Sequence, residues 1–222
     1  AYHAAGLDRE VLLALGMDNV PAADLSKWEE ISRRIHNPEG AVTVGVVGKY
    51  RTADAYKSLT EALCHGGLDR RVGVDVDVID AEDLETGHVA DRLRGVHGVL
   101  VPGGFGVRGT EGKINAIRFA RERNVPFLGI CLGMQLATIE SVRSFFDLPG
   151  ASSTEFGPTD DPVVGLMSEW ANGDALKRRT ASGDIGGTLR LGAYPTRLRR
   201  GSLAHTVYGE TGNNTLQIDY SN

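Results

Sequence analysis

Residues 125–140 read VPFLGICLGMQLATIE, and this stretch decides the expected fold. Its first six residues are a short apolar run, typical of a buried strand, and a helical pattern begins two residues after Cys131. Between the two stands Gly129-Ile130-Cys131-Leu132-Gly133, which has the glycine–x–nucleophile–x–glycine form of a nucleophile elbow. Glycine is needed on both sides because the strand-to-helix turn is too tight for side chains there. We therefore expect Cys131 at the carboxyl edge of a sheet, with its thiol pointing outward.

The chain before this elbow alternates strand and helix patterns. Strand-like runs occur at 41–50, 72–80, 97–104 and 125–130, and helical patterns at 54–65, 88–96, 111–124 and 133–146. In the second run Val74, Val76 and Val78 alternate with acidic residues, which predicts a half-exposed strand near a sheet edge. Strands and helices in this order predict an α/β fold, a parallel sheet with helices on both faces.

Neither end of the chain continues this alternation of strand and helix patterns. Residues 1–40 carry helical patterns at 7–15 and 25–35, with Ser26 as a candidate cap, and end in the breaker Asn37-Pro38-Glu39-Gly40. We interpret them as a helical interdomain connector, and residues 41–222 as the domain proper. Glycine, proline, serine and aspartate dominate residues 149–162, and residues 183–202 indicate a loop and a pair of strands.

Composition narrows the class of protein. The 222 residues are 41% hydrophobic, enough for one large domain with a short appendage. No apolar run approaches the roughly 20 residues of a membrane span, and the first residues do not have the pattern of a signal peptide. The net charge is −5 without a dominant basic patch, so we expect neither a membrane nor a nucleic acid as partner. Two cysteines fit a reduced, cytoplasmic protein, and Cys64 is expected to be a buried small side chain in a helix.

The chemistry expected at Cys131 is nucleophilic. A helix N-terminus beneath the sulfur favours the thiolate, the reactive form, and the N–H of Leu132 can help to hold an oxyanion. A second donor is expected in Pro102-Gly103-Gly104-Phe105-Gly106, because neighbouring parallel strands end on the same edge of a sheet. We choose the N–H of Gly103, where no Cβ blocks a ligand.

Other interpretations of these motifs stay open. A cysteine in this pattern can be a buried structural residue, and glycine turns are common. A phosphate-binding loop is the rival for the glycines, but residues 45–50, GVVGKY, have the wrong spacing and lack the Ser or Thr. The two glycine motifs on consecutive strand ends together favour the nucleophile.

Residues 100–140 as a whole resemble the glutamine-hydrolysing domain of CTP synthases, a class I glutamine amidotransferase domain with flavodoxin-like layers. The resemblance extends to further short motifs: VGKY (47–50), DAYKS (54–58), STEF (153–156), PVV (162–164) and GGTLRLG (186–192). Residues 1–40 resemble the connector that follows the synthase domain. The likeness covers residues 1–209, and other class I glutamine amidotransferases share GxCxG but not this whole set.

The resemblance implies a reaction. Cys131 would attack the side-chain amide of L-glutamine and release ammonia, with Gly103 and Leu132 as the oxyanion hole, and water would hydrolyse the glutamyl thioester. No cofactor or metal is implied for this domain. ATP and Mg²⁺ would serve the synthetase domain, the partner that converts UTP to CTP in pyrimidine biosynthesis. The full enzyme is implied to be a cytoplasmic homo-oligomer.

The resemblance also implies a substrate pocket. Gly104, Phe105 and Gln135 would line it, and Glu155 would bind the substrate ammonium through a charge-assisted hydrogen bond. Alternatively, Gln135 is an ordinary residue of a helix surface and Glu155 is a solvated loop acid.

The catalytic base that the resemblance implies is not found in this sequence. A cysteine amidase needs a histidine to carry the proton and a carboxylate to orient it, and the resemblance implies both shortly after Tyr208. Residues 210–222 contain no His or Arg, so an arginine for the substrate carboxylate is missing too. His205 is the only late histidine, and we expect it on a surface turn, a poor candidate for the base.

Three explanations of the missing base stay open. In the first, the chain is a fragment whose ending was lost; in the second, it is a divergent domain with a binding, regulatory or interaction role; in the third, it is an enzyme that uses another base. We expect little or no glutamine turnover from these 222 residues alone. A nucleotide-binding module is a distant alternative.

Overall fold

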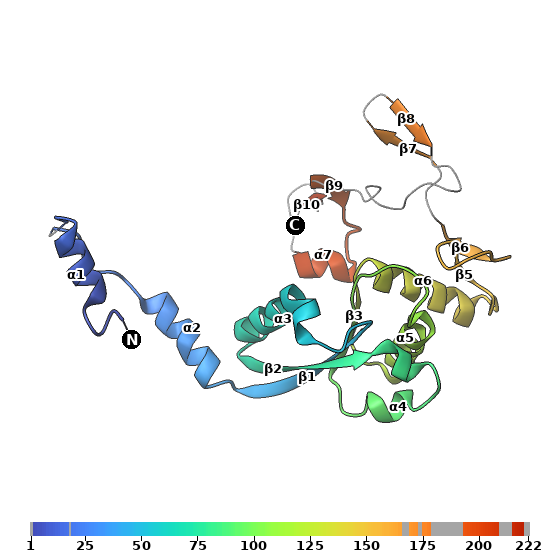
Figure 1. Ribbon diagram of the computed structural model, residues 1–222, viewed down its shortest axis with the longest axis horizontal. Helices are drawn as coiled ribbons and strands as arrows, with labels where there is room; N and C mark the ends of the chain where they lie inside the picture. The colour runs from blue at the N-terminus through green and yellow to red at the C-terminus, as the bar shows by residue number, and fades with distance from the viewer. Residues whose placement is uncertain are drawn as a thin grey trace. The chain divides into compact units, whose positions relative to one another are not determined.

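The computed structural model describes residues 2–17, 19–165, 169–172, 175–178, 193–208 and 215–219. The chain divides into two compact units, Ala1–Leu166 and Met167–Asn222. The first unit holds the central sheet and its helices (Figure 1). The expected GGTLRLG motif at 186–192 lies outside the described residues.

A four-stranded parallel sheet forms the centre of the first unit, in the order β2-β1-β3-β4. Its strands are β1 (Gly40–Gly48), β2 (Val72–Asp80), β3 (Gly98–Val101) and β4 (Phe127–Gly129). The expected parallel α/β sheet is confirmed, and so is the position of the alternating run at a sheet edge, because among the described strands β2 pairs with β1 alone. The strands run parallel, so the loops after β3 and β4 leave from the same edge of the sheet.

Helices and short 3₁₀ turns lie between these strands, and one helix, α6, follows the last of them (Figure 1). They are η1 (Ala53–Tyr56), α3 (Lys57–Arg70), η2 (Ala81–Leu84), α4 (Val89–Arg92), α5 (Thr110–Arg123) and α6 (Leu132–Phe145). The sheet is covered on both faces, as neighbouring strand residues show: Val46 packs with Tyr56 and partly buried residues of α3, whereas Val47 belongs to a larger cluster with α5 and α6. This alternation is the two-residue period of a strand buried on both sides.

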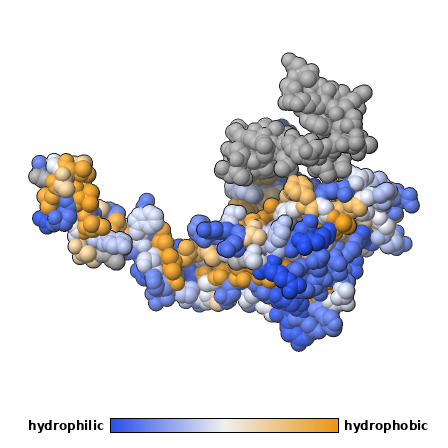
Figure 2. All heavy atoms as spheres, viewed as in Figure 1, coloured by the Kyte–Doolittle hydropathy of each residue, from blue (hydrophilic) through white to orange (hydrophobic). Residues whose placement is uncertain are grey.

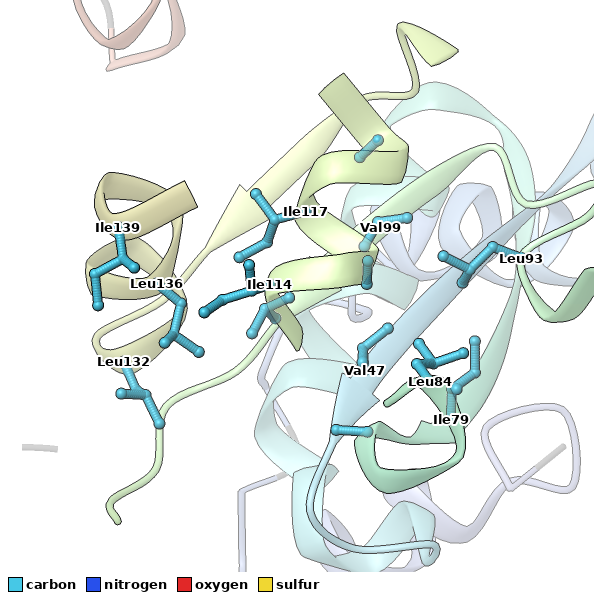
Figure 3. Packing of buried hydrophobic residues seen from close by; sticks show 14 residues of the cluster. Val47, Ile79, Leu84, Leu93, Val99, Ile114, Ile117, Leu132, Leu136 and Ile139 are labelled. Atoms are coloured by element: carbon cyan, nitrogen blue, oxygen red, sulfur yellow. The ribbon is translucent and has the colours of Figure 1, made fainter. Parts of the chain in front are cut away.

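The larger cluster positions α6, the helix that begins after Cys131. Leu132, Leu136 and Ile139 line the side of α6 that faces α5 (Figure 3). Each is 1% exposed or less, and burial of such a side chain contributes roughly 1.5–3 kcal/mol. The N-terminus of α6 is therefore held against the sheet by its own apolar face.

An ion pair links α5 and α6 as well. Glu140, 1% exposed, accepts hydrogen bonds from the guanidinium of Arg121 at 2.8 and 3.1 Å and from the hydroxyl of Ser144 at 2.7 Å. Burial raises the pKa of the Glu140 carboxyl, but the hydrogen bonds from Arg121 and Ser144 outweigh it and leave the pKa below its usual value. The carboxylate therefore stays charged and keeps the two helices in register.

The N-terminal helices are α1 (Leu7–Ala14) and α2 (Ser26–His36), close to their expected ranges. Neither contains a buried residue, and Figure 2 shows their apolar side chains on the surface. The expectation that Ser26 caps α2 is wrong: Ser26 is the first helical residue, and its N–H donates to the carboxylate of Asp24 at 3.0 Å. The Asp24 carboxylate thus accepts from one of the first amides of the helix, which have no partner within the helix itself.

The remaining elements are short. Between residues 149 and 165 the chain forms the paired strands β5 (Ser152–Ser153) and β6 (Pro162–Val164). The second unit contains the antiparallel pairs β7 (Glu169–Asn172) with β8 (Ala175–Arg178) and β9 (Ala193–Arg197) with β10 (Thr215–Asp219), and helix α7 (Leu203–Tyr208). Within the described part of the chain, no helix is both long and apolar enough to cross a membrane.

Candidate active site around Cys131

Cys131 occupies the turn between β4 and α6, as expected from the sequence. Its backbone has φ 53° and ψ −107°, a conformation that residues with a side chain rarely adopt, and the thiol-bearing residue is exposed. Such strain costs roughly 1–3 kcal/mol and persists only where the surrounding packing enforces it. The structural interpretation of Cys131 as a buried residue is therefore wrong.

The two glycines of the elbow are required by close backbone contacts. A Cβ on Gly129 would lie 2.6 Å from the carbonyl carbon and oxygen of Gly133. A Cβ on Gly133 would lie 2.1 Å from the carbonyl oxygen of Val101, in the neighbouring strand β3. Both distances are shorter than any tolerable contact, so the expected reason for glycine at these positions is confirmed.

The two expected oxyanion donors flank the cysteine. A Cβ on Gly103 would lie 3.4 Å from the Cβ of Cys131. The loop after β3, residues 102–106 and called the glycine loop below, therefore meets the elbow after β4. Leu132 is the first residue of α6, with its side chain in the core and its amide among those that a helix leaves without a partner. Among the described residues, neither the Gly103 nor the Leu132 amide has a hydrogen-bond acceptor. Both amides therefore remain available as donors, and both belong to residues next to Cys131.

Glu155 is held against the same glycine loop. Its Oε1 accepts a hydrogen bond from the N–H of Gly106 at 2.7 Å, and its own N–H donates to the hydroxyl of Ser153 at 3.2 Å. The side chain is half-buried, so Glu155 is fixed beside the loop instead of being a freely solvated acid. Its second oxygen, Oε2, accepts no hydrogen bond from any described residue.

The other expected pocket residues lie at the same edge of the sheet. Phe105 is 54% exposed, and a Cβ on Gly104 would lie 3.6 Å from a methyl group of Leu132. Gln135 is half-buried one turn into α6, where its N–H donates to the carbonyl of Cys131 at 3.2 Å. All of them lie on the two loops around the cysteine or in the first turn of α6.

Three cations at this edge were missed at the level of sequence. Lys49, directly after β1, donates from its ammonium to the carbonyl of Phe105, and the guanidinium of Arg108 donates to the carbonyl of Lys49 at 3.3 Å. Lys113 is 1% exposed, and its Nζ lies 4.0 Å from where a Cβ on Gly104 would be. Burial lowers the pKa of Lys113 to about 8, and repulsion from Lys49 and Arg108 adds to the effect.

A sequence signal for Lys113 did exist. It precedes Ala116, Ile117 and Ala120 by three, four and seven residues, the spacing of one helix face, and all of these are buried. For Lys49 the only signal was its place at a strand end.

Two further expectations can be compared with the structure. His205 lies in helix α7 and is 7% exposed, so the expected surface turn is wrong. Cys64 lies within α3 and is half-buried, close to the expected small helical residue. In the part of the chain that the structure describes, no three His, Cys, Asp or Glu side chains gather in a way that could hold a metal ion.

Known proteins resemble this chain over most of its length. The family model "Glutamine amidotransferase class-I" matches residues 52–212. The CTP synthase of Beijerinckia indica is 58% identical over 212 residues, and that of Acidiphilium cryptum is 59% identical over 211 residues; each alignment covers 95% of this chain. The chain spans only 39% of the length of these two curated relatives.

A solved structure supports the same comparison. The glutaminase domain of the CTPS from Trypanosoma brucei, solved with bound acivicin, superposes with a TM-score of 0.64 at 32% sequence identity. The match covers 75% of this chain and 62% of that one.

Proposed function

Because this chain belongs to the class-I glutamine amidotransferase family, we propose that it is the glutamine-hydrolysing part of a CTP synthase and that Cys131 is its nucleophile. One observation carries the proposal: an exposed cysteine in a strained elbow, next to the amides of Gly103 and Leu132, neither of which has an acceptor among the described residues. A structural cysteine has no need of this geometry, whereas acyl transfer requires it.

The reaction follows from these groups. The Cys131 thiolate attacks the side-chain amide carbon of glutamine, and the carbonyl oxygen takes up the negative charge of the tetrahedral intermediate. The Gly103 and Leu132 amides stabilise this charge, and one such donor is typically worth roughly 10²–10³ in rate. The carbon–nitrogen bond then breaks, ammonia leaves with a proton, and water hydrolyses the glutamyl thioester. A histidine that carries the proton from the thiol to the ammonia, and a carboxylate that orients this histidine, stay predictions. That this step needs no cofactor stays a prediction as well.

Glu155 is proposed to bind the α-ammonium group of the substrate. Its Oε1 is held by the Gly106 amide, and its Oε2 accepts no hydrogen bond from any described residue, which leaves this oxygen to accept one from the substrate. The half-exposed Phe105, the half-buried Gln135 and the backbone at Gly104 are the further residues proposed to contact the substrate. A carboxylate with one oxygen held by the protein and the other open to a ligand can bind the ammonium group of an amino acid.

The activity of the whole enzyme is proposed from its relatives. Ammonia released at Cys131 would pass to a synthetase domain, where UTP, activated by ATP with Mg²⁺, becomes CTP. We further propose a cytoplasmic, homo-oligomeric enzyme. The proposed activity is supported by the name of the relatives, since CTP synthases match this chain over 95% of its length.

Covalent labelling with acivicin tests the proposed site. We expect mass spectrometry to find one adduct on Cys131 in the wild-type chain and in Cys64→Ala, none in Cys131→Ala, and slower labelling in the presence of L-glutamine. Cys64→Ala is the matched control because it removes the only other thiol. An adduct on Cys64, or labelling that L-glutamine does not slow, would contradict the proposal.

A further inference from the structure

The peptide bond between Phe105 and Gly106 is held from both ends by opposite charges. Its carbonyl oxygen accepts a hydrogen bond from the Lys49 ammonium, and its N–H donates to the Glu155 carboxylate at 2.7 Å. A Cβ on Gly106 would lie 3.8 Å from the Lys49 Nζ, which places the ammonium directly against this peptide. The cation thus meets the negative end of the peptide dipole and the anion meets its positive end.

Lys49 is itself fixed by its backbone. Its N–H donates to the hydroxyl of Tyr56 at 2.9 Å, and its carbonyl accepts from the Arg108 guanidinium at 3.3 Å. Tyr56 is only 8% exposed and belongs to the core cluster on the α3 face of the sheet. The ammonium therefore reaches the glycine loop from a rigid anchor at the end of β1.

This arrangement favours one orientation of the peptide. If the peptide flipped, its carbonyl would point at the Glu155 carboxylate and its N–H at the Lys49 ammonium, so two charge-assisted hydrogen bonds would become two repulsive contacts. Because glycine permits such a flip without steric cost, the orientation at Gly106 depends on these charged partners. Glu155 in turn depends on the Gly106 amide for the position of its carboxylate.

We propose that Lys49 is a positioning residue for glutamine binding: its ammonium fixes the Phe105–Gly106 peptide, and through that peptide it fixes Glu155 for the substrate's α-ammonium group. This inference rests on the proposed function and deepens it, since it assigns a residue to substrate recognition. Lys49 acts on binding and not on the thiol, because the peptide that it holds is joined to Glu155 and not to Cys131.

The test measures inactivation by a diazoketone analogue of glutamine, which carries the substrate's α-ammonium group, beside alkylation by iodoacetamide, which does not. The variants are Lys49→Met, Lys49→Gln and Lys49→Arg, with Lys57→Met as the control for an exposed lysine in the same part of the chain. We expect Lys49→Met and Lys49→Gln to raise the half-saturating concentration of the analogue about tenfold, a typical effect of losing a charged hydrogen bond. The maximal inactivation rate and the iodoacetamide rate should stay within about twofold of the wild-type values.

The conservative variant separates positioning from folding. Lys49→Arg retains a cationic donor and should recover most of the affinity, and Lys57→Met should behave as the wild type. An unchanged half-saturating concentration in Lys49→Met overturns the inference, and so does an equal fall of both reactions, which would show general damage. If the wild-type chain is not labelled at Cys131 by the analogue, the proposed function fails as well; if it is labelled but insensitive to Lys49, only this inference fails.

Discussion

Replacement of Lys113 by methionine tests the electrostatics beneath the glycine loop. The Lys113 side chain is 1% exposed, and its ammonium has no hydrogen-bond acceptor or ion-pair partner among the described residues. Methionine has a similar length and no charge, so it fills the same space without the cost of burying an unpaired ammonium. We therefore expect Lys113→Met to be more stable than the wild type at neutral pH.

The magnitude follows from the lowered pKa of this lysine. Burial moves the pKa from 10.5 to about 8, a difference of 10.5 − 8 = 2.5, and at ~1.4 kcal/mol per pKa unit the penalty is about 3 kcal/mol. Between these two pKa values the unfolded chain binds the proton and the folded chain does not, so the free energy of unfolding of the wild type rises with pH across this window. Below pH 8 the full penalty is present, and above pH 10.5 it has disappeared.

Urea unfolding followed by far-UV circular dichroism measures the effect. At pH 7 the midpoint for Lys113→Met should exceed that of the wild type by the equivalent of about 3 kcal/mol, and the difference should shrink steadily as the pH rises from 8 to 10.5. Lys57→Met, which removes an exposed lysine, should change neither value. A destabilised Lys113→Met at pH 7, or a difference that does not depend on pH, would refute the reasoning.

Three further predictions concern the elbow and its support. Gly133→Ala should lower the free energy of unfolding by about 1–3 kcal/mol in urea titrations because its methyl group has no space, and an unchanged midpoint would contradict the contact. Arg121→Met should lower the free energy of unfolding by about 1.5–3 kcal/mol at pH 7, because the buried Glu140 carboxylate loses its closest cationic partner and retains only the Ser144 hydroxyl and the more distant Arg118 guanidinium. This loss should narrow as the pH falls, because the Glu140 carboxyl of the variant protonates at a higher pH than that of the wild type, and it should be smallest below pH 4.5, where the wild-type carboxyl protonates as well. A loss independent of pH would exclude the ion pair as its cause. Iodoacetamide should alkylate Cys131 about tenfold faster than the half-buried Cys64, and peptide mapping that finds Cys64 modified first would speak against the nucleophile.

Local sequence patterns determined the sheet and the elbow. The periods of strand and helix depend on near neighbours along the chain, so the four parallel strands and the helices between them could be predicted from residues a few positions apart. The meeting of Gly103 with Cys131 was predictable too, because consecutive parallel strands in a doubly wound sheet end on one edge. Glycine at 129 and 133 followed from the tightness of the turn itself.

Only the tertiary structure decided which charges meet at that edge. The hydrogen bonds that hold the Phe105–Gly106 peptide come from Lys49 and Glu155, which lie 56 and 49 residues away from their partners along the chain. No local pattern predicts such a contact, because it depends on how three loops from different strands pack together. The same applies to Lys113: its helical spacing indicated a buried position, but only the packing of α5 against the glycine loop shows that no described residue offers an acceptor to its ammonium. The sequence determined where Cys131 lies, at the turn after a strand, and long-range packing determined which charged groups lie at the same edge of the sheet.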